Sequence, residues 1–330
     1  MLMFRSRHLV FQTALVFGIV ILVLVAFHTG TVRDSLSRFK ANHIDPIHED
    51  ENATPHPKYK PAPSYTPPPI TDPFPALATS TPPPIPAYNV PEPDGWKKHD
   101  LPVAPPLIIG FTRSWPMLLQ AVVSYITAGW PPEQIYVVEN TGMQQANARG
   151  QLSLQHPWYL NHATLKKLGV HIIQTPVLLS FAQLQNFYLS LSYTHDGRPR
   201  ISHENGFENL TPRAGEPGYK SLYTLCLEEL KRTLATDKRW GLRFFAYDHL
   251  TLQNPRAIED VNGWDTLIPY YMTDCDTYTR LHMRNWSQTD ANCGVISDTS
   301  VALDDLRALY RDPRVTPRFT DPNPPAPEAE

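Results

Sequence analysis

Residues 107–140 read LIIGFTRSWPMLLQAVVSYITAGWPPEQIYVVEN, in which two short apolar runs flank a helical pattern. The runs at 107–112 and 135–139 have the length and composition of buried strands. Between them, apolar residues recur every three or four positions over 115–126, and Gly129 marks the end of the predicted helix. A strand–helix–strand unit of this kind joins two parallel strands. The stretch therefore predicts an α/β domain with a mainly parallel sheet flanked by helices.

Polar residues follow both strands of this unit. Thr112 and Arg113 come after the first strand, and Glu139 and Asn140 end the second. Because ligands of open parallel sheets bind beyond the carboxyl ends of the strands, these four residues are candidate ligand contacts. The first turn lacks a Gly-x-Gly-x-x-Gly pattern, which argues against a dinucleotide-binding fold. For Glu139 alone, an ordinary turn carboxylate is the alternative interpretation.

Further strands and helices are predicted beyond this unit. An apolar run at 170–174 predicts a third strand, and apolar positions at helical spacing predict a helix over 181–192. Asn186 lies on the polar edge of that helix, where it is either a binding residue or a solvated one. A strand is predicted at 242–246, and Asn254-Pro255 supplies the N-cap and first-turn proline of a short helix.

Two carboxylates, Asp274 and Asp276, stand at the predicted start of a later helix, beside an aromatic cluster. One carboxylate in such a place can bind a divalent cation that neutralises phosphate charge. The other can take a proton from an attacking hydroxyl group. The alternative is that both merely favour the positive N-terminus of the helix they open.

Five segments, taken together, carry a resemblance to a known group of proteins. They are Ile-Ile-Gly-Phe-Thr-Arg-x-Trp-Pro, Tyr-Val-Val-Glu-Asn-Thr-Gly, Phe-Ala-Gln-Leu-Gln-Asn-Phe-Tyr-Leu, Gly-Trp-Asp and Thr-Asp-Cys-Asp. In this order they resemble fungal type II membrane proteins that look like glycosyltransferases of the GT-A fold, the nucleotide-diphospho-sugar transferase fold. The resemblance covers about residues 101–325 and is closest over the first 90 of them.

The resemblance implies roles for individual residues. The two strand ends, Thr112-Arg113 and Glu139-Asn140, would hold the nucleoside of a nucleotide sugar. Asn186, Trp264 and Asp265 would complete that binding site. The segment Gly263-Trp264-Asp265, followed by Asp274-Cys275-Asp276 and Arg280-Leu281, is similar to a segment of inverting family-two glycosyltransferases, which makes Asp274 the candidate catalytic base. A divalent cation, Mn²⁺ by resemblance, would hold the diphosphate.

One expected strand is missing from the sequence pattern. A GT-A domain places a strand with a metal-binding Asp-x-Asp motif after the 181–192 helix, and the similar proteins carry a Trp-Ser-His-x-Asp strand there. Residues 193–219 show no period-two pattern, so we predict an irregular segment in which the strand is lost. Either a deletion or a mis-spliced gene removed it, or the metal is held elsewhere, with Asp196 and Asp276 as candidates.

The first hundred residues predict an anchor and a stalk. The apolar segment 9–27 is just long enough to cross a bilayer as a helix. Arg5 and Arg7 favour a cytoplasmic tail at 1–8 and a signal anchor that is not cleaved, with a signal peptide as the alternative. More than half of the 35 prolines lie between 46 and 106, so we predict a disordered, semi-rigid stalk over 28–100.

The remaining features concern compartment and partners. The glycosylation sequons at Asn52, Asn209 and Asn285 agree with a lumenal domain. Three cysteines allow at most one internal disulfide, whose pairing stays open. A net charge of −3, without a basic cluster outside the flanks of the apolar run, argues against nucleic-acid binding.

Together these features predict a membrane protein with a single span in the Golgi or another secretory-pathway membrane. Its globular domain is predicted over 101–325, with a disordered tail at 326–330. The predicted activity is transfer of a sugar from a nucleotide-diphosphate donor to a glycan or glycoprotein acceptor. The alternative is a catalytically degenerate, membrane-anchored binding or scaffold protein.

Overall fold

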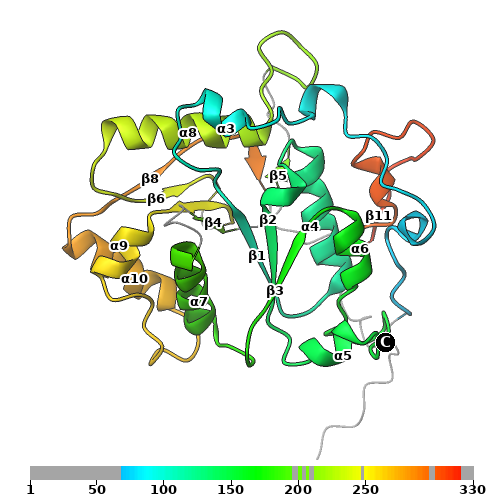
Figure 1. Ribbon diagram of the computed structural model, residues 1–330, viewed down its shortest axis with the longest axis horizontal. Coiled ribbons are helices and arrows are strands. Elements are labelled where there is room, and N and C mark those ends of the chain that lie inside the picture. The colour runs from blue at the N-terminus through cyan, green and yellow to red at the C-terminus, as the bar shows by residue number, and fades with distance from the viewer. Residues whose placement is uncertain are drawn as a thin grey trace, which may run out of the picture. The chain divides into compact units, whose positions relative to one another are not determined.

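A seven-stranded sheet forms the centre of the protein in the computed structural model (Figure 1). The structure describes residues 68–194, 200–202, 206–207, 212–246, 249–296 and 302–320. The strands lie in the order β3-β2-β1-β4-β7-β6-β8, and β7 alone of these seven runs antiparallel to its neighbours. In chain order the strands are β1 (Leu107–Phe111), β2 (Ile135–Glu139), β3 (His171–Gln174), β4 (Arg200–Ser202), β6 (Trp240–Phe244), β7 (Thr251–Gln253) and β8 (Ser287–Asp290).

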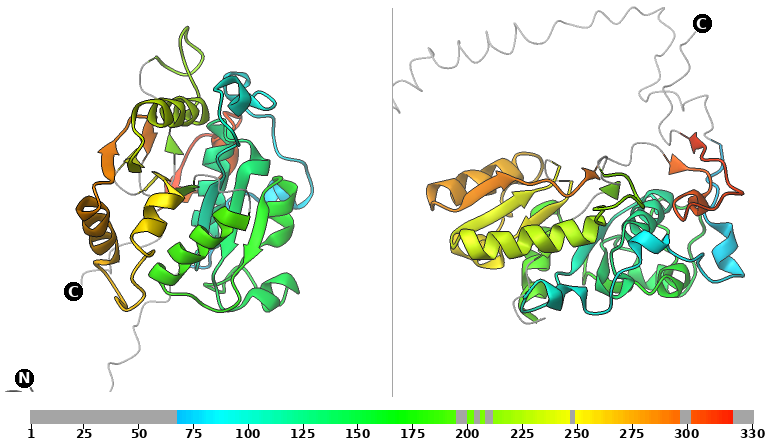
Figure 2. Two further views of the ribbon diagram at one scale, coloured as in Figure 1. Left: turned by 60° about the vertical axis from the view of Figure 1, so that its left-hand side comes forward. Right: turned by 90° about the horizontal axis from the view of Figure 1, so that it is seen from above.

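Helices cover both faces of this sheet (Figure 2). The longer ones are α4 (Trp115–Thr127), α7 (Phe181–Thr194), α8 (Leu222–Thr236) and α10 (Thr273–Met283), and the shorter ones are α5 (Gln144–Ala148), α6 (His162–Lys167) and α9 (Pro255–Asp260). Two small strand pairs lie outside the main sheet: β5 (Gly206–Phe207) with β9 (Val295–Ile296), and β10 (Ala302–Leu303) with β11 (Phe319–Thr320). The short helix η3 (Pro132–Gln134) precedes β2, and η4 (Leu306–Ala308) follows β10.

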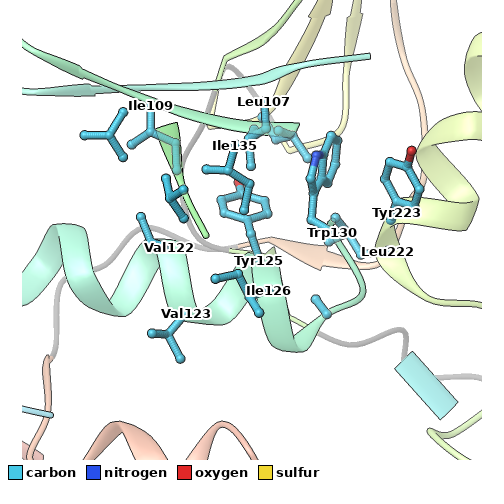
Figure 3. Packing of buried hydrophobic residues seen from close by; sticks show 14 of the residues in the cluster. Leu107, Ile109, Val122, Val123, Tyr125, Ile126, Trp130, Ile135, Leu222 and Tyr223 are labelled. Carbon is cyan, nitrogen blue, oxygen red and sulfur yellow. The ribbon is translucent and has the colours of Figure 1, made fainter. Parts of the chain in front are cut away.

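The alternation of side chains along β1 divides the core between the two faces. Leu107 and Ile109 belong to the large cluster that contains α4 and α8, whereas Ile108 packs with α7. Figure 3 shows Leu107, Ile109 and Ile135 of the strands lying over Val122 and Tyr125 of α4. The predicted strand–helix–strand unit is therefore confirmed, and its strands are parallel.

The face that carries α7 depends on a glycine in β1. A Cβ atom on Gly110 would lie 2.1 Å from the Tyr188 hydroxyl oxygen and 3.3 Å from a methyl group of Leu184. Both side chains are buried, so they have little room to move aside. The absence of a side chain at Gly110 thus lets α7 lie close against the strand that leads to the candidate site.

The prediction that residues 193–219 lack the expected strand is wrong. Strand β4 occupies the middle of the sheet, where it runs parallel to β1 (Leu107 opposite Ile201) and antiparallel to β7 (Ile201 opposite Leu252). A strand of three residues is too short to show a period-two pattern, and its pairing with two neighbours stabilises it. The sheet therefore has no gap at this position.

The predicted boundary between stalk and domain at residue 101 is also wrong. Within 68–100 the chain forms η1 (Pro75–Ala78), η2 (Ala87–Asn89) and α3 (Gly95–Lys98). Phe74 and Leu77 are buried in the main cluster. These side chains enter the core one at a time, without the periodic pattern of a long helix or strand, which is why the sequence pattern did not reveal them.

Hydrogen bonds attach the same segment to the rest of the domain. The Lys167 ammonium donates to the Leu77 carbonyl at 2.6 Å, and the Asn89 amide donates to the Thr127 carbonyl at 2.7 Å. The packed unit therefore includes residues 68–100. The rest of the predicted stalk, 28–67, lies outside the described residues, as does the predicted tail at 326–330.

The predicted membrane anchor is not tested by the structure. Residues 1–8 and 9–27, the predicted tail and span, lie outside the described part of the chain. In the part that the structure describes, no helix has the length and apolar character needed to span a bilayer. The signal anchor remains a prediction.

Candidate functional site

Strands β1, β2 and β3 end at the same edge of the sheet, toward the bottom of Figure 1. The segment after β3 leads from this edge into α7. Helix α7 in turn contacts the loop between α9 and α10. The rings of Phe181 in α7 and Trp264 in that loop meet edge to face, with centroids 5.5 Å apart. The predicted site residues lie along this path.

Glu139, at the end of β2, is fully buried and fully hydrogen bonded. Its Oε1 accepts from the Asn147 amide at 2.7 Å and from the Thr141 hydroxyl at 3.3 Å. Its Oε2 accepts from the Gln174 amide at 2.9 Å and lies 2.9 Å from His162 Nε2. These four partners use the acceptor positions of the carboxylate.

Charge at Glu139 is stabilised despite its burial. Burial raises the pKa of the Glu139 carboxyl, but hydrogen bonds from His162, Gln174 and Asn147 outweigh that effect and leave the pKa below its ordinary value. Glu139 is thus neither a solvated turn carboxylate nor a free ligand group. It joins β2 to α5, α6 and β3, and it fixes the backbone that follows β2.

Asn140 continues this anchoring toward α7. Its amide nitrogen donates to the Leu179 carbonyl at 2.9 Å, and its amide oxygen accepts from the Leu179 N–H at 2.7 Å and from the Thr175 hydroxyl at 3.2 Å. The side chain is buried. Asn140 therefore positions the loop before α7 and has no exposed amide to offer a nucleoside.

Thr112 and Arg113 differ from these two residues because they are exposed at the end of β1. The following residue, Ser114, has a φ of +70°, and its N–H donates to the Pro157 carbonyl at 3.0 Å. That bond holds the turn in place while the Arg113 side chain faces solvent. Of the four predicted strand-end residues, Thr112 and Arg113 are the ones available to contact a ligand.

Asn186 of α7 holds the loop that contains Trp264. Its amide oxygen accepts from the Trp264 N–H at 2.8 Å, and its amide nitrogen donates to the Trp264 carbonyl at 2.9 Å. The neighbouring Gly263 has a φ of +78°, and a Cβ atom there would lie 2.6 Å from the Asn186 oxygen. The Gly-Trp pair therefore allows a close approach that a larger residue at 263 would block.

Arg280 of α10 holds the same loop from the other side. Its guanidinium donates to the carbonyls of Val261 and of Gly263, the latter at 2.8 Å. It also forms an ion pair with Asp276, with a shortest N–O distance of 2.7 Å. Both guanidinium contacts with Asp276 fall on its Oδ2, so Arg280 engages one oxygen of the Asp276 carboxylate as its i, i+4 partner.

Asp274 differs from Asp276 because neither of its carboxylate oxygens has a hydrogen-bond or ion-pair partner among the residues that the structure describes. It is half-buried in the first turn of α10. Trp264, in the loop between α9 and α10, is buried. Asp265 accepts from the Leu267 N–H at 2.8 Å, which uses one oxygen of its carboxylate. Asp274 thus has the open carboxylate that a general base needs.

The structure does not locate the expected metal site. Within the described ranges, no three His, Cys, Asp or Glu side chains are grouped closely enough to hold an ion. The candidate Asp196 lies outside those ranges.

The position of β4 identifies a signal that sequence reasoning missed. The strand ends at Ser202, and His203, Glu204 and Asn205 follow in the sequence. Ser202-His203-Glu204-Asn205 thus matches the Ser-His-x-Asp part of the expected pattern, with Asn in the place of Asp. Residues 203–205 are not described by the structure.

Of the three sequon asparagines, Asn285 lies in the described part of the chain and is exposed. It follows α10 and has a φ of +59°, while Ser287 of its sequon begins β8. Asn52 and Asn209 lie outside the described residues.

Comparison with solved structures shows a distant structural likeness. No protein-family model matches the chain, and no curated protein matches it. Among solved structures, the chain is similar to the mannosyltransferase PcManGT of Pyrobaculum calidifontis, solved in complex with GDP-Man and Mn²⁺. The TM-score is 0.38 and the identity 14%, over 62% of this chain and 61% of that chain. This chain therefore spans less than two thirds of that protein's length.

Proposed function

We propose that this protein is a glycosyltransferase of the secretory pathway that moves a sugar from a nucleotide-diphosphate donor to a glycan or glycoprotein acceptor. The parallel α/β sheet flanked by helices agrees with the GT-A-like fold that the sequence motifs imply. The observation that carries the proposal is the contrast between two neighbouring acids. Asp276 is paired with Arg280, whereas Asp274 presents an open carboxylate beside an anchored loop.

In the proposed reaction, Asp274 accepts the proton of the acceptor hydroxyl as its oxygen attacks the anomeric carbon and the nucleoside diphosphate departs. Exposed Thr112 and Arg113 contact the donor, and Glu139 and Asn140 position the turn beside them. A divalent cation, with Mn²⁺ as the first choice, would neutralise the diphosphate. His203 and Glu204, next in sequence after β4, join Asp196 as candidates for holding it.

The test uses the full chain with Mn²⁺ and a panel of UDP- and GDP-sugars. We expect hydrolysis or transfer, and Asp274→Asn lowers the rate about 10²- to 10⁴-fold because a carboxamide does not accept the proton. Glu133→Gln is the matched control, since Glu133 is an exposed carboxylate at the opposite end of β2. Full activity of the Asp274 variant would exclude this residue as the base.

Calorimetry distinguishes the proposed enzyme from the alternative, a membrane-anchored binding or scaffold protein. Each nucleotide sugar is titrated into the full chain with and without Mn²⁺. Metal-dependent binding supports the enzyme, whereas the absence of binding across the panel favours the scaffold.

A further inference from the structure

The loop between α9 and α10 exposes large apolar side chains that a folded protein normally buries. Leu267, Tyr270, Tyr271 and Met272 are 88%, 83%, 75% and 59% exposed. The two tyrosine rings lie side by side, with centroids 5.7 Å apart and planes tilted by 47°. Grouped exposure of this kind marks an interaction surface, whereas single exposed apolar residues do not. We name residues 267–272 the aromatic loop.

Both ends of the aromatic loop are held by the domain. Asp265 caps the start through the Leu267 N–H, and the Met272 carbonyl accepts from the Asp276 N–H at 3.0 Å at the other end. Tyr271 and Met272 have φ values of +59° and +64°, a conformation that costs free energy for residues other than glycine. The hydrogen bond to the Met272 carbonyl is made from this conformation, and both rings are exposed to solvent.

The charges around the aromatic loop select among possible ligands. Asp265 and Asp274 flank it, and the sequence contains no Lys, Arg or His between Arg256 and Arg280. Arg280 itself is engaged by Asp276 and by backbone carbonyls. The charged residues that flank the aromatic loop in the sequence are both acidic and disfavour an anionic lipid surface or a phosphate group as its ligand.

A neutral sugar ring fits both features of this surface. One face of a pyranose carries C–H groups, which pack on the electron-rich face of an aromatic ring. Its hydroxyl groups donate hydrogen bonds, and carboxylates accept them. The aromatic loop ends two residues before Asp274, so a sugar bound on the tyrosines lies beside the proposed base.

We propose that the aromatic loop binds a neutral sugar of the acceptor and presents its hydroxyl group to Asp274. The catalytic part of this proposal rests on the proposed glycosyltransferase function. The sugar-binding part is independent of it, because the exposed rings and flanking carboxylates are present whether or not transfer takes place.

Direct binding is measured by saturation-transfer NMR on the full chain. The probes are methyl α-mannoside, methyl β-glucoside and chitobiose. We expect binding of at least one probe, weakened about tenfold or more in Tyr270→Ala and Tyr271→Ala. Tyr271→Phe keeps the ring and should retain binding, and Leu234→Ala is a control for an exposed apolar residue on α8. Unchanged binding in both alanine variants overturns the proposal.

Activity measurements separate this proposal from the proposed function. With an active wild type, Tyr271→Ala should raise the acceptor KM about tenfold, whereas the control Leu234→Ala should leave the acceptor KM unchanged. Equal transfer kinetics in wild type and variant overturn the acceptor role. A wild type without any hydrolysis or transfer contradicts the enzyme proposal, and the NMR result then decides the sugar site alone. Co-sedimentation with phosphatidylcholine–phosphatidylserine vesicles that Tyr270→Ala and Tyr271→Ala both abolish, in place of sugar binding, would also overturn it.

A second, independent observation concerns the cysteines, whose pairing the sequence left open. Cys226 of α8 and Cys293, which follows β8, are both buried in the main cluster, whereas Cys275 is exposed on α10. All three are free thiols in this structure, so the pairing stays open.

Discussion

At the scale of single residues, the acidic residues of this domain have different roles, which cannot be told from the side-chain type alone. Glu139 is buried among four hydrogen-bond partners, Asp276 is paired with Arg280, and Asp274 is open. A carboxylate that is fully hydrogen bonded stabilises the fold, whereas one with open acceptor positions is able to take a proton. Partners in space therefore separate the structural acids from the candidate base.

The Glu139 network should make stability depend on pH. Because its pKa in the folded state lies below the ordinary value of 4.5, its contribution is fully present above that value and is lost as pH falls through the folded pKa. Glu139→Gln should lower the free energy of unfolding by about 2–3 kcal/mol at pH 7. The difference from wild type should shrink in acid below the ordinary pKa. Urea unfolding between pH 7 and pH 3 measures it, and a difference that does not change with pH would contradict the assignment.

At the scale of elements, α7 is the connection between the sheet edge and the candidate base. The Asn140 side chain holds the segment that leads into α7, and Asn186 within α7 holds the backbone of Trp264. Arg280 then ties the same loop to α10. The position of Asp274 is thus set through contacts that begin at the end of β2.

The contact between α7 and the Trp264 loop is open to a direct test. Asn186→Ala leaves the Trp264 N–H and carbonyl without their partner, at a cost of about 1–3 kcal/mol. We expect faster hydrogen exchange over 261–272 and lower activity, with β1 and β2 unchanged. Ser190→Ala on the exposed side of α7 is the control. Equal exchange rates in the two variants would show that Asn186 does not hold the loop.

At the scale of the whole chain, the proline-rich region is not a single spacer. Its last part, 68–100, packs on the domain through Phe74 and Leu77. A fragment that begins at residue 101 should therefore be less stable than one that begins at 68, by roughly 3–5 kcal/mol from these two side chains. Thermal and urea unfolding compare the fragments. Phe74→Ala should reproduce part of the loss and Ile70→Ala, at an exposed position, should not.

The compartment is a further prediction at this scale. If the domain enters the secretory pathway, Asn285 should carry a glycan, because it is exposed at the end of α10. The suitable variant is Asn285→Asp, since Asp tolerates the left-handed backbone at this residue. Ser287→Ala is unsuitable because the Ser287 hydroxyl bonds to Asp237 and Arg243. Treatment with an N-glycosidase should shift the electrophoretic mobility of wild type more than that of the variant. Equal shifts would show that Asn285 carries no glycan.

The sequence by itself determined the strand–helix–strand unit at 107–139, the helices that begin near residues 181, 255 and 274, and the candidate acid Asp274. Each of these rests on local information: apolar periodicity, N-cap residues and short motifs. Only the tertiary structure decided that β4 completes the sheet, that Phe74 and Leu77 belong to the core, and that Glu139 is buried among hydrogen-bond partners. A short central strand and a buried carboxylate are stabilised by partners far away in the chain, and no local pattern records those partners.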